Sequence, residues 1–137
     1  MLKVPSVPFV KATACGNDFL LIDGMHAPAD LVAFSRRLCD RHRGVGADGV
    51  EWLFPDNEAD IRARLFNADG SEAEISGNGT RCVAAWLAAE RGMEHARIRT
   101  GAGVRECKPA PGGGGGRESG TAAGGPLQDE SPAGALV

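Results

Sequence analysis

The chain has 137 residues, 42% of them hydrophobic, and a formal net charge of −3 at pH 7. This length allows one domain with a real core but hardly two, and a negative charge without a basic stripe argues against a nucleic-acid partner. The four cysteines form no CxxC or Cys/His cluster, which disfavours zinc, and they are too sparse for a secreted disulfide scaffold.

The first residues loosely resemble a signal peptide, with Lys3, a short apolar run and a cleavage-like Ala12-Thr13-Ala14. Pro5, Pro8 and Lys11 interrupt the apolar run, which argues against a signal. No stretch approaches the ~18 apolar residues of a membrane span. We therefore expect a cytoplasmic protein with reduced thiols and no membrane partner.

Apolar periodicity and turn residues divide the chain into short strands and two helices. An amphipathic helix is predicted over 28–41, and a second helix begins near Gly79 and ends at Gly92, a residue type suited to a helix end. The predicted strands cover residues 9–14, 19–23, 50–54, 60–66, 72–75, 96–100 and 104–107.

The second helix is unusual because residues 82–89 read Cys-Val-Ala-Ala-Trp-Leu-Ala-Ala, apolar on every face. Such a helix is expected to be buried on all sides, with the short strands wrapped around it. Its N-terminus carries unpaired N–H groups and the positive end of the helix dipole. That end would form a site for a carboxylate or phosphate.

A G-x-G-x-x-G pattern at Gly44, Gly46 and Gly49 suggests a dinucleotide fingerprint. That fingerprint needs a strand before the glycines and a helix after them. Here the predicted helix comes first and a strand follows, so the order is inverted and nucleotide binding is not favoured.

The composition changes after Lys108, which sets a predicted domain over 1–108 and a low-complexity tail over 109–137. The tail holds five consecutive glycines at 112–116, four prolines and almost no large apolar side chains, so we expect it to be disordered. Two origins stay open, a flexible tail and a product of a shifted reading frame.

Five motifs resemble, in order and spacing, the N-terminal half of the diaminopimelate epimerase family. They are Gly16-Asn17-Asp18-Phe19 and the runs at 43–49 (Arg-Gly-Val-Gly-Ala-Asp-Gly), 66–72 (Phe-Asn-Ala-Asp-Gly-Ser-Glu), 77–82 (Gly-Asn-Gly-Thr-Arg-Cys) and 100–103 (Thr-Gly-Ala-Gly). The resemblance spans about residues 9–107. It implies an α/β (α+β) fold with a curled, mostly antiparallel sheet around a central buried helix.

The resemblance also implies a cofactor-independent isomerase of lysine biosynthesis, which interconverts LL- and meso-diaminopimelate with two cysteines, one from each domain. It places Asn17, Asn67, Gly77 and Asn78 at the substrate. Without the resemblance, closing a turn would be the favoured role of Asn17 and Asn67. No metal and no cofactor are implied.

One motif residue departs from the family. The family's catalytic cysteine directly precedes Gly-Asn-Gly, and here that residue is Ser76, whereas Cys82 matches a structural cysteine. A helix dipole worth up to ~2 kcal/mol lowers a pKa by only about 1.5 units, enough for a thiol but not for an alcohol. Ser76 is also a typical helix cap.

We therefore expect an epimerase-like chain that is inactive or impaired, because the family's second domain, with the other cysteine, is also missing from this sequence. The expected partner is a small amino acid, diaminopimelate, and an exposed cleft face would favour self-association. Two alternatives stay open: a related isomerase or dehydratase that uses Ser76, and a non-enzymatic half-domain.

Overall fold

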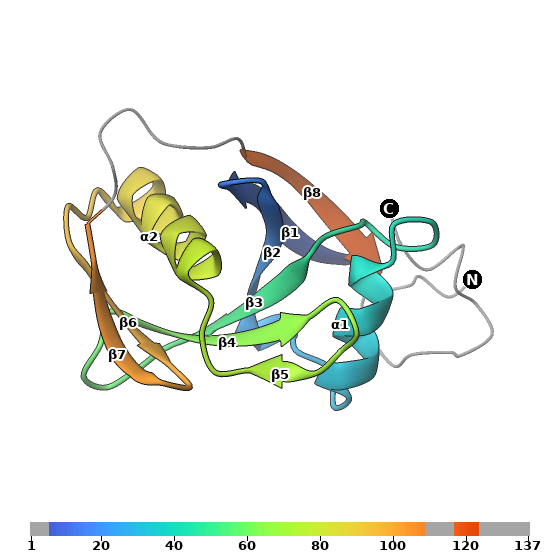
Figure 1. The fold of residues 1–137 in the computed structure, drawn as a ribbon, viewed down its shortest axis with the longest axis horizontal. Coiled ribbons are helices and arrows are strands. Elements are labelled where there is room, and N and C mark those ends of the chain that lie inside the picture. Colours follow the sequence, from blue (N-terminus) through green and yellow to red (C-terminus); the bar gives the residue numbers. More distant parts are fainter. Residues whose placement is uncertain (1–5, 109–116, 124–137) are drawn as a thin grey trace.

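The computed structural model describes residues 6–108 and 117–123 (Figure 1). The helical elements are η1 (Gly24–His26), α1 (Leu31–Cys39) and α2 (Gly77–Arg91). The strands are β1 (Ser6–Ala14), β2 (Asn17–Asp23), β3 (Gly49–Phe54), β4 (Ile61–Asn67), β5 (Glu72–Ala73), β6 (Ala96–Thr100), β7 (Gly103–Cys107) and β8 (Arg117–Ala123). No helix in these ranges is long and apolar enough to cross a membrane.

One sheet connects all the strands, in the order β7-β6-β4-β3-β2-β1-β8, with β5 paired to β4. The β2–β3 and β4–β6 pairs are parallel and the other pairs are antiparallel. The sheet curves around α2, with β6 and β7 on one side of the helix and β1 and β8 on the other (Figure 1). The predicted fold class, a curled and mostly antiparallel sheet around a central helix, is confirmed.

The two faces of the sheet bury separate hydrophobic clusters. On one face Phe19 and Leu21 of β2 pack with Val83 and Leu87 of α2. On the other face the cluster contains side chains of β2, α1 and β3, which include Leu20, Ile22, Phe34, Leu38 and Trp52. The side chains of β2 thus alternate between the two clusters, as expected for a strand covered on both sides.

Helix α1 is shorter than the predicted 28–41 because aspartates limit both ends. The Asp30 side chain accepts a hydrogen bond from Ala33 N–H and caps the start. At the other end Asp40 has extended backbone, and its carboxylate accepts from the N–H groups of His42 and Arg43. The chain then turns back towards the sheet.

Helix α2 begins at Gly77 and ends, as predicted, at Gly92, which adopts a left-handed conformation with φ 66°. The expectation that it is buried on every side is wrong for part of its surface. Cys82, Val83, Ala84 and Leu87 are buried, whereas Ala85 and Ala89 are exposed. Alanine carries too little apolar area for its exposure to cost much.

Strand β8 pairs antiparallel with β1 and falls within the segment 109–137 that the sequence predicts to be disordered. For residues 117–123 the structure therefore differs from that expectation. The edge of β1 offers a row of backbone N–H and C=O groups that another strand can pair with, whatever its side chains are. The remainder of the segment lies outside the described residues.

Candidate functional site

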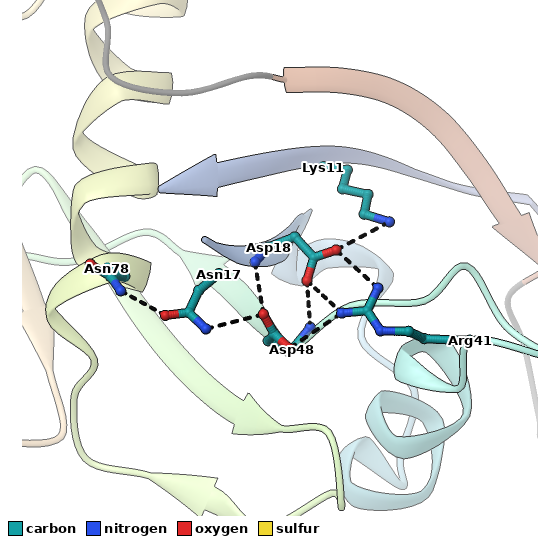
Figure 2. Close-up of polar contacts among 6 residues, drawn as sticks. All are labelled: Lys11, Asn17, Asp18, Arg41, Asp48 and Asn78. Carbon is teal, nitrogen blue, oxygen red and sulfur yellow. Dashed lines mark hydrogen bonds and ion pairs between the residues drawn. The ribbon is translucent and has the colours of Figure 1, made fainter. Parts of the chain in front are cut away.

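The predicted site residues gather at one edge of the sheet, where β2 and β3 begin and β4 ends. The register aligns Phe19 with Gly49 and Gly49 with Asn67 across the three strands. The N-terminal turn of α2 reaches the same edge, because Asn78 Nδ2 donates a 2.7 Å hydrogen bond to Asn17 Oδ1 (Figure 2). Two predicted substrate-binding residues, 61 positions apart in the chain, are thus in direct contact.

The glycine-rich loop before β3 holds Asn17 in place through Asp48. One carboxylate oxygen of Asp48 accepts from Asn17 Nδ2 at 3.2 Å and from Asp18 N–H at 3.0 Å. In return, Asp48 N–H donates to Asp18 Oδ1 at 3.0 Å. In the structure this loop thus orients the amide of Asn17.

Two basic side chains compensate the charge of this acidic pair. Arg41 donates to Asp18 at 2.8 Å and to Asp48 at 3.2 Å, and Lys11 Nζ lies 3.4 Å from Asp18 (Figure 2). The hydrogen bond from Arg41 is the main cause that holds the pKa of Asp18 well below its usual range. Asp18 therefore stays ionised at neutral pH and keeps the network intact.

Loss of the Asp48 carboxylate should weaken this corner of the molecule. We expect Asp48→Ala to lower the free energy of unfolding by about 1–2 kcal/mol, because three donors lose their acceptor but remain partly hydrated. Urea denaturation at neutral pH measures the change. Glu94→Ala, at an exposed acid, is the matched control, and equal effects of the two substitutions would contradict a positioning role for Asp48.

The first turn of α2 retains free donors. Ser76 is its N-cap: the Ser76 side-chain oxygen accepts from Gly79 N–H at 3.1 Å, and the Ser76 carbonyl accepts from Thr80 N–H at 2.8 Å. The N–H groups of Gly77 and Asn78 precede these bonds and have no acceptor among the described residues. Together with the helix dipole they can bind an anion.

Asn67 lies at the same edge of the sheet, but the hydrogen bond of its side chain goes to Ser71 and not to Asn17 or Asn78. Its Nδ2 donates to Ser71 Oγ at 3.1 Å, and its N–H donates to Ser71 O, so it closes the turn between β4 and β5. Its side chain is exposed. A role of Asn67 at the substrate therefore stays a prediction.

An exposed thiol next to Asn17 was not expected from the sequence. Cys15 has a positive φ of 51°, and Arg81 Nη1 lies 3.8 Å from its Sγ and 3.1 Å from Asn78 Oδ1. Its position two residues before Asn17 is the signal that could have drawn attention to it. Cys82, by contrast, is buried, and burial raises its pKa to about 11.

A cavity of about 510 Å³ lies at the opposite end of α2, away from this edge. Its walls are mostly apolar and include Phe9, Leu21, Leu53, Ile61 and Trp86. None of the predicted site residues lines it. Among residues 6–108 and 117–123, no group of three or more His, Cys, Asp or Glu side chains could hold a metal ion.

Comparison with solved structures finds the same fold in an epimerase and in an isomerase. A hydroxyproline epimerase from Agrobacterium vitis with bound trans-4-OH-L-proline matches with a TM-score of 0.60 and 19% identity, over 82% of this chain and 40% of that one. A methylitaconate-delta-isomerase matches with a TM-score of 0.61 and 15% identity, over 97% and 40%. At these identities the likeness concerns the fold alone.

Proteins related by sequence have a higher identity to this chain than these solved structures. The diaminopimelate epimerase of Pelotomaculum thermopropionicum is 50% identical over 102 residues, which cover 70% of this chain and 36% of the relative. That of Acidiphilium cryptum is 48% identical over 98 residues, covering 71% and 35%. The chain thus spans about a third of the length of these relatives. Since the diaminopimelate epimerase family model also matches residues 9–122, the chain belongs to the diaminopimelate epimerase family.

Proposed function

We propose that this chain provides a substrate-binding site of a cofactor-free epimerase that acts on diaminopimelate in cytoplasmic amino-acid biosynthesis. The observation that carries the proposal is the 2.7 Å hydrogen bond between Asn78 and Asn17, beside the free N–H groups of Gly77 and Asn78. This bond joins an amide side chain of the sheet to a helix end that can bind an anion, a suitable pair for an amino-acid carboxylate.

The chemistry fits the arrangement. Removal of an α-proton places negative charge on the adjacent carboxylate, and preorganised N–H donors stabilise that charge as it develops. The N-terminus of α2 would take the α-carboxylate, while the amides of Asn17 and Asn67 orient the substrate. The hydrogen bonds through Asp48 and Arg41 restrict Asn17 before any ligand arrives.

The family's catalytic thiol position carries Ser76, and we propose that the chain abstracts no α-proton there. The Ser76 hydroxyl oxygen accepts from Gly79 N–H, and no histidine, carboxylate or amine in the described residues hydrogen-bonds to it. His42 and His95 are exposed. An alcohol without a general base remains un-ionised, which also disfavours a dehydratase that uses Ser76.

The test is exchange of the α-proton in D₂O with LL- and meso-diaminopimelate, followed by NMR. The parent chain should show no exchange above buffer. In Ser76→Cys a thiolate can take the proton and return a deuteron, so exchange should be at least about a hundredfold faster than in buffer alone, the lower range of a positioned general base.

Two controls make this experiment specific. Ser6→Cys adds a thiol at an exposed position of β1 and should not exchange. Cys15→Ser removes the exposed thiol near Asn17 and should leave the parent result unchanged. Exchange by the parent chain would refute the prediction that it is inactive. If Ser76→Cys binds the ligand but shows no exchange, a non-enzymatic binding domain would be favoured instead.

Self-association through exposed apolar surface stays a prediction. The large apolar side chains exposed in the described part of the chain are Met25, Val32 and Ile75, and Ile75 directly precedes Ser76. A contact through Ile75 would cover the proposed site. Sedimentation with and without diaminopimelate would therefore show whether ligand and self-association compete.

A further inference from the structure

Glu51 is a carboxyl group buried inside the sheet–helix core. It lies in the middle of β3, paired with Leu21 of β2 and Leu65 of β4, and its side chain is directed to the face that α2 covers. Only 3% of the residue is exposed. A glutamate in such surroundings is rare unless it has a partner.

The carboxyl of Glu51 is directed at the first turn of α2. Its Oε2 lies against Gly79, so close that a side-chain carbon at position 79 would overlap it. The Glu51 carboxyl makes no hydrogen bond and no ion pair with any residue of the described ranges. Burial is the single cause that shifts its pKa. The helix end with free N–H donors thus has an unpartnered carboxyl directly beneath it.

The titratable groups that face Glu51 are few. From β2 and β4 its neighbours are the apolar Leu21 and Leu65. On α2 the titratable group that interacts with Glu51 is Cys82, whose own pKa is raised by burial and further by Glu51, Asp18 and Cys15. Among the residues that the structure describes, no cation opposes the Glu51 carboxylate, and burial raises its pKa to about 8.

We propose that Glu51 sets the charge at the N-terminus of α2 and thereby the pH range in which that site binds a carboxylate ligand. This inference rests on the proposed function, since it concerns the same helix end. With Glu51 protonated, the free N–H groups of Gly77 and Asn78 attract the ligand. With Glu51 ionised, its negative charge offsets the positive end of the helix and repels the ligand. Glu51 is a positioning residue that acts through the helix.

The test is the pH dependence of ligand affinity in the full chain, measured by titration calorimetry. The probe is pimelate, which has both carboxylates of diaminopimelate but no amino group that titrates. We expect the Kd of the parent chain to rise at least about tenfold between about pH 6.5 and 9.5, from repulsion by a nearby buried charge. In Glu51→Gln it should change by less than about twofold.

Further variants separate charge from fold. Glu94→Gln makes the same change at an exposed position near the end of α2 and should keep the parent profile. Glu51→Leu removes the charge with an apolar side chain and should give the same flat profile as Glu51→Gln. A parent profile that persists in both Glu51 variants, or no binding of pimelate at about pH 6.5, would overturn the inference. pH-dependent binding without α-proton exchange in Ser76→Cys would overturn the proposed function alone.

Discussion

Replacement of Glu51 by glutamine is expected to raise the free energy of unfolding at about pH 8 by about 3–5 kcal/mol, and to change it little at about pH 4. The side chain is buried without a partner beneath the first turn of α2. Folding at neutral pH therefore requires either an ionised carboxylate in an apolar core or the uptake of a proton. Glutamine has nearly the same shape and avoids both costs.

The sign follows from the two pKa values of Glu51. Burial raises the pKa of the folded chain to about 8 from the ordinary 4.5. The stability that the folded chain has with Glu51 protonated is thus fully present below the unfolded pKa. It falls as pH rises and is lost once the pH passes the folded pKa. Urea denaturation at several pH values measures the difference between variant and parent, which should grow across this window. A difference that is the same at every pH would contradict the assignment.

Leu87→Ala is expected to lower the free energy of unfolding by about 2–5 kcal/mol, because it opens a cavity between α2 and the sheet. Leu87 is completely buried in the cluster that fixes the helix. Since Asn78 and the free N–H groups belong to the same helix, we also expect weaker binding of pimelate. Urea denaturation and calorimetry at about pH 6.5 measure the two effects.

Leu38→Ala is the matched control for this pair of effects. Leu38 is equally buried, but it belongs to α1 and to the cluster on the other face of the sheet. It should cost a similar free energy of unfolding and leave pimelate affinity close to that of the parent chain. If Leu87→Ala and Leu38→Ala lost the same affinity for pimelate, binding would not depend specifically on the position of α2.

The strands were predictable because their side chains alternate, as in Ile61, Ala63 and Leu65 of β4, which are all buried in the structure. The burial of α2 was predictable only in part. A run of alanines looks apolar on every face, yet Ala85 and Ala89 face outwards. Periodicity cannot tell a buried alanine from an exposed one, since either position costs little.

The site was predictable where turn residues marked it. Asn17 and Asn78 stand out in their glycine motifs and are in contact, and Ser76 is a helix cap as its residue type suggests. Asp48 and Glu51 could not be assigned in the same way. The first looks like an ordinary loop residue until its partner 30 positions away is known. The second is a glutamate in a short apolar strand, where a charged residue is normally expected to face solvent.

Strand β2 contributes to both hydrophobic clusters, with Phe19 and Leu21 on one side and Leu20 and Ile22 on the other. A slip of one residue in its pairing would exchange these sets and leave each against the wrong helix. The two clusters therefore both depend on the same pairing of β2. The contact between Asn17 and Asn78 thus depends on the register of β2 as well as on the loop that holds Asn17.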